Sequence, residues 1–223
     1  MRRTLLILIA LIIVIGGGVA FLMVVSQRAA FHPNTASSTP NLAGQAIFTD
    51  GEYGFTIRYP QTYTTDYDFA SFYHLPANWR SNALPDATGT PIIAIVGYRT
   101  ASDHSYPRYF DAEVRIGASK DPKEIDRCEV AATDQAERQL PDTNLGGVMF
   151  KTFAFEGAGM MQYVKGVSYR VVRNDTCIAI EKLETGSSYR DDPPSAEDIP
   201  QATLDQAYQA LDKVVESITF VGS

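Results

Sequence analysis

The first strands of this chain are marked by the alternation of apolar and polar positions. Residues 53–60 (YGFTIRYP) place apolar side chains at every second position, which is typical of a strand with one buried face. Residues 92–96 form a continuous apolar run, which predicts a strand buried on both faces. Residues 111–116 alternate again, so we expect the charged side chains of that strand to face solvent. They are Asp111, Glu113 and Arg115.

The second half of the chain predicts more strands and a final helix. Residues 148–155, 168–173 and 177–183 are extended in character, and residues 174–176 (NDT) predict a tight turn between the last two. Towards the C-terminus apolar residues recur at spacings of three and four, a pattern typical of an amphipathic helix, and residues 219–221 could add a short strand. The apolar positions of the helix are Leu204, Tyr208, Leu211, Val215 and Ile218.

Residues 121–139 predict one or two short helices in the middle of the chain. They mix charged residues with spaced apolar ones, with Pro122 near their start and Pro141 just past their end. Together with the strands, this pattern predicts one α+β domain over residues 45–223, in which helices flank a curved antiparallel sheet.

The N-terminus has the pattern of a membrane anchor. Arg2 and Arg3 precede residues 4–25, a run of 22 uncharged, mostly apolar residues. As a helix this run is roughly 33 Å long, enough to cross a hydrocarbon core of about 30 Å. The positive-inside rule places the amino terminus in the cytoplasm. We therefore predict a single transmembrane helix within residues 1–28, which holds the domain on the extracytoplasmic side of the cell membrane.

A cleaved signal peptide is the alternative to an anchor. Its apolar region is usually about 7 to 15 residues long, shorter than the run found here. Cleavage after Ala29 or Ala30 would place Gln27 or Arg28 at the minus-three position, where a small side chain is preferred. The following residues, 29–44, are rich in Pro, Ser, Thr, Asn and Gly, and we predict that they form a flexible tether.

The chain beyond the predicted anchor is acidic. After Arg28 there are 26 acidic and 16 basic residues, which gives a formal charge of −10. Nucleic acids and anionic lipid surfaces both select basic patches. The charge therefore argues against nucleic acid as a partner, and it leaves the N-terminal helix as the predicted contact with the membrane.

Cys128 and Cys177 are the only cysteines of the chain, and we predict a disulfide between them. Both follow the predicted anchor, and oxidising conditions outside the membrane let such bonds persist. Two buried free thiols, or half of a metal site, are the alternatives.

Sequence motifs that carry chemistry are missing. The chain has no H-E-x-x-H pattern, no G-x-S-x-G nucleophile elbow, no P-loop and no G-x-G-x-x-G. We therefore predict no catalytic residue, no metal site and no cofactor. A small cell-envelope hydrolase that uses acidic residues such as Asp66 and Asp68 stays open as an alternative.

Aromatic residues gather in one part of the chain, since nine of the 24 lie within residues 53–79. Outside the cell aromatic faces often stack on sugars, so Tyr73, Trp79 and Arg80 are possible ligand contacts, and within the cluster we expect Trp79, beside Arg80, to be the most exposed residue. Core packing together with a folded-over loop is nevertheless the favoured interpretation of this cluster. Residues 157–161 (GAGMM) could likewise form a soft edge for a protein partner, but core packing is again favoured because apolar residues between strands are usually core.

Three short motifs resemble the Mog1/PsbP-like α+β fold: GFTIRYP (residues 54–60), NLGGVMF (144–150) and SITF (217–220). The resemblance covers about residues 45–221. It implies a curved antiparallel sheet flanked by helices, usually in a binding or assembly-assisting protein without catalytic activity. We therefore favour a membrane-tethered module that binds an envelope protein or polymer over the hydrolase.

Overall fold

The computed structural model describes residues 44–69, 71, 75–100, 109–132, 137–188, 193 and 198–221. The predicted anchor (1–28), nearly all of the predicted tether (29–44) and Tyr73 lie outside these residues. Within the described part of the chain, no helix is both long enough and apolar enough to cross a membrane.

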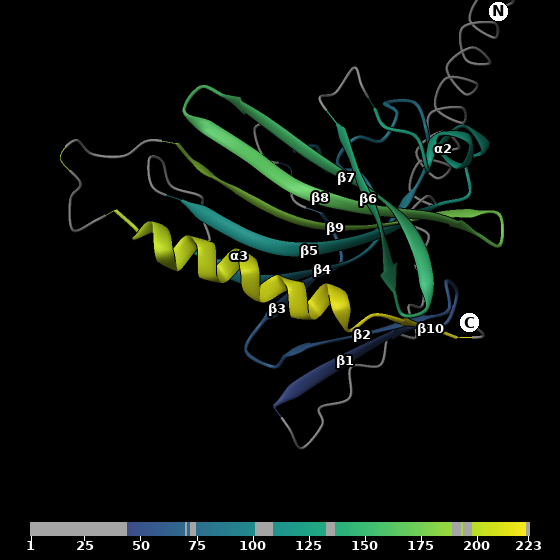
Figure 1. The fold of residues 1–223 in the computed structure, drawn as a ribbon, viewed down its shortest axis with the longest axis horizontal. Helices are drawn as coiled ribbons and strands as arrows, with labels where there is room; N and C mark the ends of the chain where they lie inside the picture. The colour runs from purple at the N-terminus through teal and green to yellow at the C-terminus, as the bar shows by residue number, and fades with distance from the viewer. Residues whose placement is uncertain are drawn as a thin grey trace, which may run out of the picture. The chain divides into compact units, whose positions relative to one another are not determined.

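Two antiparallel sheets and two helices build the domain (Figure 1), and the predicted α+β class is confirmed. Seven strands form the larger sheet, and three form the smaller. In spatial order the larger sheet contains β3 (Thr64–Asp66), β4 (Thr90–Arg99), β5 (Phe110–Ser119), β9 (Thr176–Ser187), β8 (Gln162–Arg173), β7 (Val148–Gly159) and β6 (Arg138–Leu145). The smaller sheet contains β1 (Gln45–Asp50), β2 (Phe55–Pro60) and β10 (Thr219–Phe220), and the helices are α2 (Pro122–Arg127) and α3 (Gln201–Glu216).

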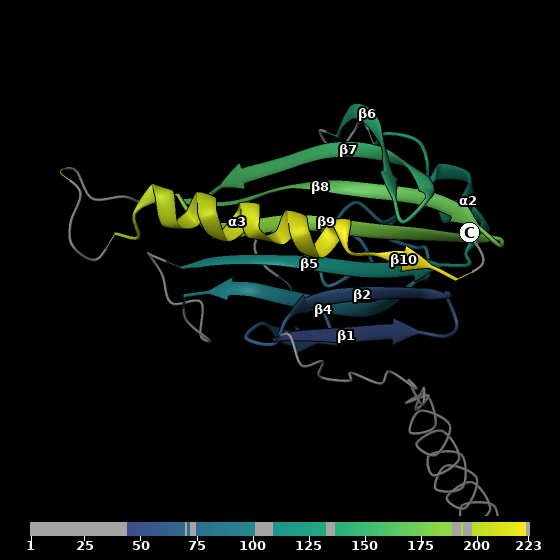
Figure 2. The same ribbon diagram turned by 60° about the horizontal axis from the view of Figure 1, so that its bottom comes forward.

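One face of the larger sheet packs against α3 and the smaller sheet (Figure 2). The apolar stripe of α3 buries Leu204, Leu211, Val214 and Val215. These side chains belong to the same apolar cluster as alternate residues of β2, β4, β5 and β9. The period-two pattern of the sequence thus identified the strand faces that form the main core.

The opposite face of the larger sheet is buried as well, which corrects one prediction. Asp111, Glu113 and Arg115 of β5 were expected to face solvent, yet at most 2% of each residue is exposed. Arg115 donates to Glu113 over 2.6 Å, and its guanidinium lies 5.0 Å from the ring centroid of Phe69. Two residues between β3 and β4 approach this face of β5: the Phe69 ring lies against Arg115, and the Trp79 carbonyl oxygen would lie 2.0 Å from a Cβ atom at Gly117. Arg115 is therefore covered by protein instead of facing solvent.

Two buried ion pairs and the hydrogen bonds of a buried carboxylate join the covering segments to one another and to the sheet. Arg80 contacts Glu124 of α2 at 2.6 Å, and both side chains are at most 2% exposed. Arg170 of β8 contacts Glu137 at 2.5 Å, again with both side chains buried. Glu181 of β9 accepts hydrogen bonds from the backbone and side chain of Ser81. Losing one member of such a pair leaves an uncompensated buried charge, so each pair holds its segment in place.

The predicted disulfide is present. Cys128, which follows α2, and Cys177 of β9 form an S–S bond of 2.04 Å with their Cα atoms 5.6 Å apart. Both residues are fully buried. The bond therefore pins α2 to the charged face of the larger sheet.

The predicted helical region is shorter than expected. The helix ends at Arg127, and residues 138–145 form the edge strand β6 instead of a continuing helix. Pro141 lies inside this strand, within a register shift between Leu140 and Thr143. An edge strand tolerates proline because one side of its backbone needs no ladder partner.

The disulfide predicts a large stability loss on its removal. Cys128→Ala with Cys177→Ala should still fold, but with a free energy of unfolding lower by about 4 kcal/mol, because the bond closes a loop across a sequence separation of 49 residues. Denaturant unfolding of the parent and the double variant measures the difference. Mass spectrometry of unreduced protein isolated from its native source should find no free thiol, and two free thiols would contradict the bond.

The buried pair of Arg170 and Glu137 predicts a defined pH dependence. Burial alone would raise the pKa of Glu137, but the charge of Arg170 and hydrogen bonds from Ala132, Asn82 and Arg170 outweigh it and hold the pKa below its ordinary value of 4.5. The ionised carboxylate therefore stabilises the fold above pH 4.5, and this contribution is lost as the pH falls through the lower folded-state pKa.

Glu137→Gln should accordingly reduce the free energy of unfolding at pH 7 by about 3 to 5 kcal/mol, because it leaves Arg170 buried without its counter-charge. The difference from the parent should shrink as the pH is lowered below 4.5. Asp142→Asn is the matched control, since Asp142 pairs with Lys151 in a half-exposed bridge and should cost less than about 1 kcal/mol. A pH-independent difference for Glu137→Gln would contradict the assignment.

Candidate functional site

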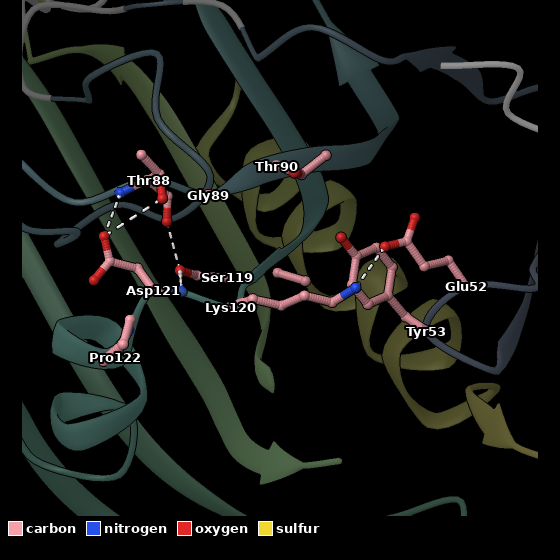
Figure 3. Close-up of a pocket in the computed structure, with 10 residues that line it drawn as sticks. Glu52, Tyr53, Thr88, Gly89, Thr90, Ser119, Lys120, Asp121 and Pro122 are labelled. Atoms are coloured by element: carbon pink, nitrogen blue, oxygen red, sulfur yellow. Dashed lines mark hydrogen bonds and ion pairs between the residues drawn. The ribbon is translucent and has the colours of Figure 1, made fainter. Parts of the chain in front are cut away.

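A crevice of about 460 Å³ opens where the turn between β1 and β2 meets one end of the larger sheet (Figure 3). Three segments that are distant in sequence supply its walls. The first segment lies in the β1–β2 turn, the second leads into β4, and the third runs from the end of β5 into α2. The polar residues that line it are Glu52, Tyr53, Thr88, Thr90, Ser119, Lys120 and Asp121.

Lys120, Glu52 and Tyr53 form the exposed side of the crevice. The Nζ atom of Lys120 lies 2.8 Å from Oε1 of Glu52, and the two side chains are 61% and 58% exposed. The same ammonium lies 5.6 Å from the ring centroid of Tyr53. This side of the crevice therefore offers a cation, an anion and an aromatic ring to a molecule from solvent.

Asp121 and Ser119 form the opposite side, where hydrogen bonds hold both side chains. Asp121 caps α2 by accepting from the Lys123 backbone N–H at 3.0 Å, and its other carboxylate oxygen accepts from the Thr88 backbone N–H at 3.0 Å. The Ser119 hydroxyl donates to the Thr88 carbonyl and accepts from the Asp121 backbone N–H (Figure 3). These bonds hold the second and third segments together, so this wall is preformed.

The pKa values of three crevice side chains, Asp121, Lys120 and Tyr53, are shifted further from neutral pH. Backbone hydrogen bonds from Thr88 and Lys123 lower the pKa of Asp121, so this carboxylate stays ionised. Its contact with Glu52 raises the pKa of Lys120, which stays protonated. Burial raises the pKa of the Tyr53 hydroxyl, which stays neutral. A general acid or base works best with a pKa near the working pH, and each of these three shifts leads away from it.

The predicted ligand contacts lie elsewhere, and one expectation about them is wrong. Trp79 was expected to be the most exposed residue of its aromatic cluster, but only 1% of it is accessible, and Arg80 is 2% accessible. Trp79 lies in a buried cluster with Ala83, Ala179 and both cysteines. Arg80 is held by Glu124, and its guanidinium lies 5.2 Å from the Trp79 ring centroid. Core packing, the favoured interpretation of these aromatic residues, thus holds for Trp79, and Tyr73 is outside the described residues.

Trp79 nevertheless packs against backbone that lines the crevice. A Cβ atom at Gly89 would lie 2.1 Å from Cδ1 of Trp79, and one at Gly117 would lie 2.0 Å from the Trp79 carbonyl oxygen. Only glycine permits such a close approach. The indole ring therefore lies directly against the backbone of Gly89, which lines the crevice.

Few of these crevice residues could be identified from sequence patterns. The Asp121–Pro122 pair carries a local signal, since an acidic residue before proline is typical of a helix start. Tyr53 and Lys120 carry none, because only the fold brings the β1–β2 turn to the end of β5. The acidic residues of the hydrolase alternative are not in the crevice: Asp66 lies at the end of β3, 3.5 Å from Arg99, and Asp68 follows it in an exposed position.

Neither a protein-family model nor a curated protein matches this chain. Among solved structures it is similar to the solution structure of cyanobacterial PsbP (CyanoP) from Synechocystis sp. PCC 6803, with 11% identity, 85% of this chain and 99% of that chain covered, and a TM-score of 0.37. It is also similar to the crystal structure of LpqN, involved in cell envelope biogenesis of Mycobacterium tuberculosis, with 12% identity, 78% and 89% covered, and a TM-score of 0.34. The first structure bears the name of the fold family that the sequence motifs resemble. At these TM-scores neither likeness bears on function.

The contact between Gly89 and Trp79 predicts the effect of a small substitution. Gly89→Ala should lower the free energy of unfolding by about 1 to 3 kcal/mol, because the added methyl group overlaps the indole ring. Trp79 is the only tryptophan, so its fluorescence reports this site directly. The parent should emit at short wavelength and resist acrylamide quenching, and the variant should shift towards the red. Gly51→Ala is the control, since nothing lies within 4 Å of an added Cβ there; equal effects at both glycines would contradict the packing.

Proposed function

We propose that this chain is a membrane-tethered, extracytoplasmic binding module without catalytic activity. Its crevice holds a sugar-like segment of an envelope polymer, and its N-terminal helix keeps the domain close to the membrane. The observation that carries the proposal is the state of the crevice: Asp121, Ser119 and Lys120 are each engaged in a contact of the fold, and the pKa values of Asp121 and Lys120 are shifted away from neutral pH.

The location outside the membrane is supported by two features. The first is the run of 22 uncharged residues behind Arg2 and Arg3. The second is the bond between Cys128 and Cys177, since disulfides of this structural kind are rare in reducing compartments. The two features are independent, because one concerns the N-terminus and the other the core of the domain.

The ligand class follows from the groups that the crevice presents. The Tyr53 ring offers an apolar face on which a sugar ring could stack. The carboxylates of Glu52 and Asp121 can accept hydrogen bonds from hydroxyl groups, and Lys120 can donate to ring or carbonyl oxygens. Aromatic, acceptor and donor groups in one open crevice suit a hydroxyl-rich ligand better than an apolar one, and the opening admits part of a long polymer.

The proposal predicts binding without turnover. The full-length protein in detergent micelles should sediment with isolated peptidoglycan sacculi, and Tyr53→Ala should weaken this binding roughly fivefold, the equivalent of about 1 kcal/mol for a lost stacking contact. Tyr67→Ala is the matched control, because Tyr67 is 44% exposed and does not line the crevice. Melting curves of both variants establish that they fold.

Three results would overturn the proposal. The first is a lack of sedimentation with sacculi, and the second is an equal loss for Tyr53→Ala and Tyr67→Ala. The third is release of soluble sugar fragments from the sacculi by the purified protein, which would favour the hydrolase. In that case Asp66→Ala and Asp68→Ala identify whether these carboxylates take part.

A further inference from the structure

Two hairpins of the larger sheet have loops of the same length but of very different residue types. The β7–β8 hairpin closes at the pair Gly159 and Gln162, and the β8–β9 hairpin closes at Arg173 and Thr176. Each therefore has a two-residue loop. Because both loops flank β8, they lie at opposite ends of the same strand (Figure 1).

All four loop residues have positive φ angles. The β8–β9 loop consists of Asn174 and Asp175, with φ of 49° and 54°. The β7–β8 loop consists of Met160 and Met161, with φ of 46° and 64°. Asparagine, aspartate and glycine are the residues that tolerate this conformation in two-residue hairpins, and methionine is not among them. One sheet thus contains a turn with suitable residues and a turn of the same length with unsuitable ones.

The unsuitable residues are also exposed. Met160 is 77% and Met161 44% accessible. The strand leads into them through Gly157, Ala158 and Gly159, whose side chains add almost no width. The hairpin tip, defined here as residues 157–163, is consequently narrow, apolar at its end and free of charged residues in a domain that carries a formal charge of −10.

We infer that the Met160–Met161 tip is a docking element that inserts into an apolar groove of a second envelope protein. Backbone strain combined with exposed apolar side chains lowers the stability of the isolated domain, and such features concentrate where a partner uses them. Methionine suits this role because its unbranched, polarisable side chain adapts to irregular apolar surfaces.

A protein groove fits this tip better than a lipid surface does. Segments that lie in membrane interfaces combine apolar residues with lysine or arginine, and residues 157–163 contain neither. The acidic domain behind the tip would also be repelled by anionic lipids. This inference goes beyond the proposed function, because the tip and the sugar-binding crevice share no residue and can fail separately.

Site-specific photo-crosslinking in the native membrane tests the inference. The full-length chain should carry a photoreactive phenylalanine analogue at Met160, or at Asp175 as the position-matched control. We expect a discrete adduct with one other protein at position 160 and none at position 175. Peptide mapping should place the crosslink on apolar residues of that protein.

A turn exchange then separates docking from stability. Met160→Asn with Met161→Gly installs the preferred hairpin residues, so it should raise the melting temperature by about 2 to 4 °C. It should also weaken binding of the purified, crosslinked partner by at least about tenfold. The reciprocal variant, Asn174→Met with Asp175→Met, should leave that binding unchanged, because its methionines lie at the other end of β8.

Each contrary result overturns the inference. Adducts with lipid alone, with a second copy of this chain, or with equal yield at position 175 would each exclude a partner groove at the tip, as would the absence of any adduct. If Met160→Asn with Met161→Gly lowered the melting temperature, the turn would not be strained. If that variant still bound the crosslinked partner as tightly as the parent, the tip would not be the docking element. Sedimentation with sacculi through Tyr53 would be unaffected by all of these results.

Discussion

The buried charges on one face of the larger sheet are the constraint on which the rest of the structure depends. Glu113, Arg115, Arg170 and Glu181 project from its central strands, and a charge left unpaired in such a place would cost several kcal/mol. The chain therefore has to supply both cover and partners. Arg80 and Glu124, brought in by the loop before β4 and by α2, pair with each other and close this layer, and the disulfide fixes α2 above it.

This layer also explains where the sequence was informative and where it was not. The strands β2 and β5, the helix α3 and the disulfide were predicted from local or countable features, and these elements are present. Alternation alone cannot distinguish a charged face in solvent from a charged face under a covering loop, since both have a period of two. Burial of Arg115 is decided by Phe69, which lies 46 positions earlier in the chain. Trp79 was misjudged for the same reason, because its surroundings come from the disulfide and from Gly89.

The crevice forms where the loop before β4, which covers the charged face, meets the larger sheet. Trp79 packs against Gly117 of β5 and against Gly89, just before β4. These two contacts fix the position of the covering loop relative to the end of the sheet. Thr88 then meets Asp121 at the start of α2, and the β1–β2 turn brings Tyr53 alongside. Of these residues, Asp121 alone had a local signal, as a helix cap. The others are polar residues whose proximity arises from tertiary contacts, which is why motif searches do not find such a site.

The buried ion pairs also explain why the strained β7–β8 turn, Met160 and Met161, persists. An unfavourable backbone conformation survives when the surrounding structure determines it more strongly than the turn itself does. The β7–β8 ladder extends from the Lys151–Arg170 pair to the Gly159–Gln162 pair, and Arg170 is fixed at its far end by Glu137. A shift of one residue in register would remove Arg170 from its buried partner and turn each side chain to the other face. The ion pair at one end of the hairpin thus sets the register, and the register forces Met160 and Met161 into the two loop positions at the other end.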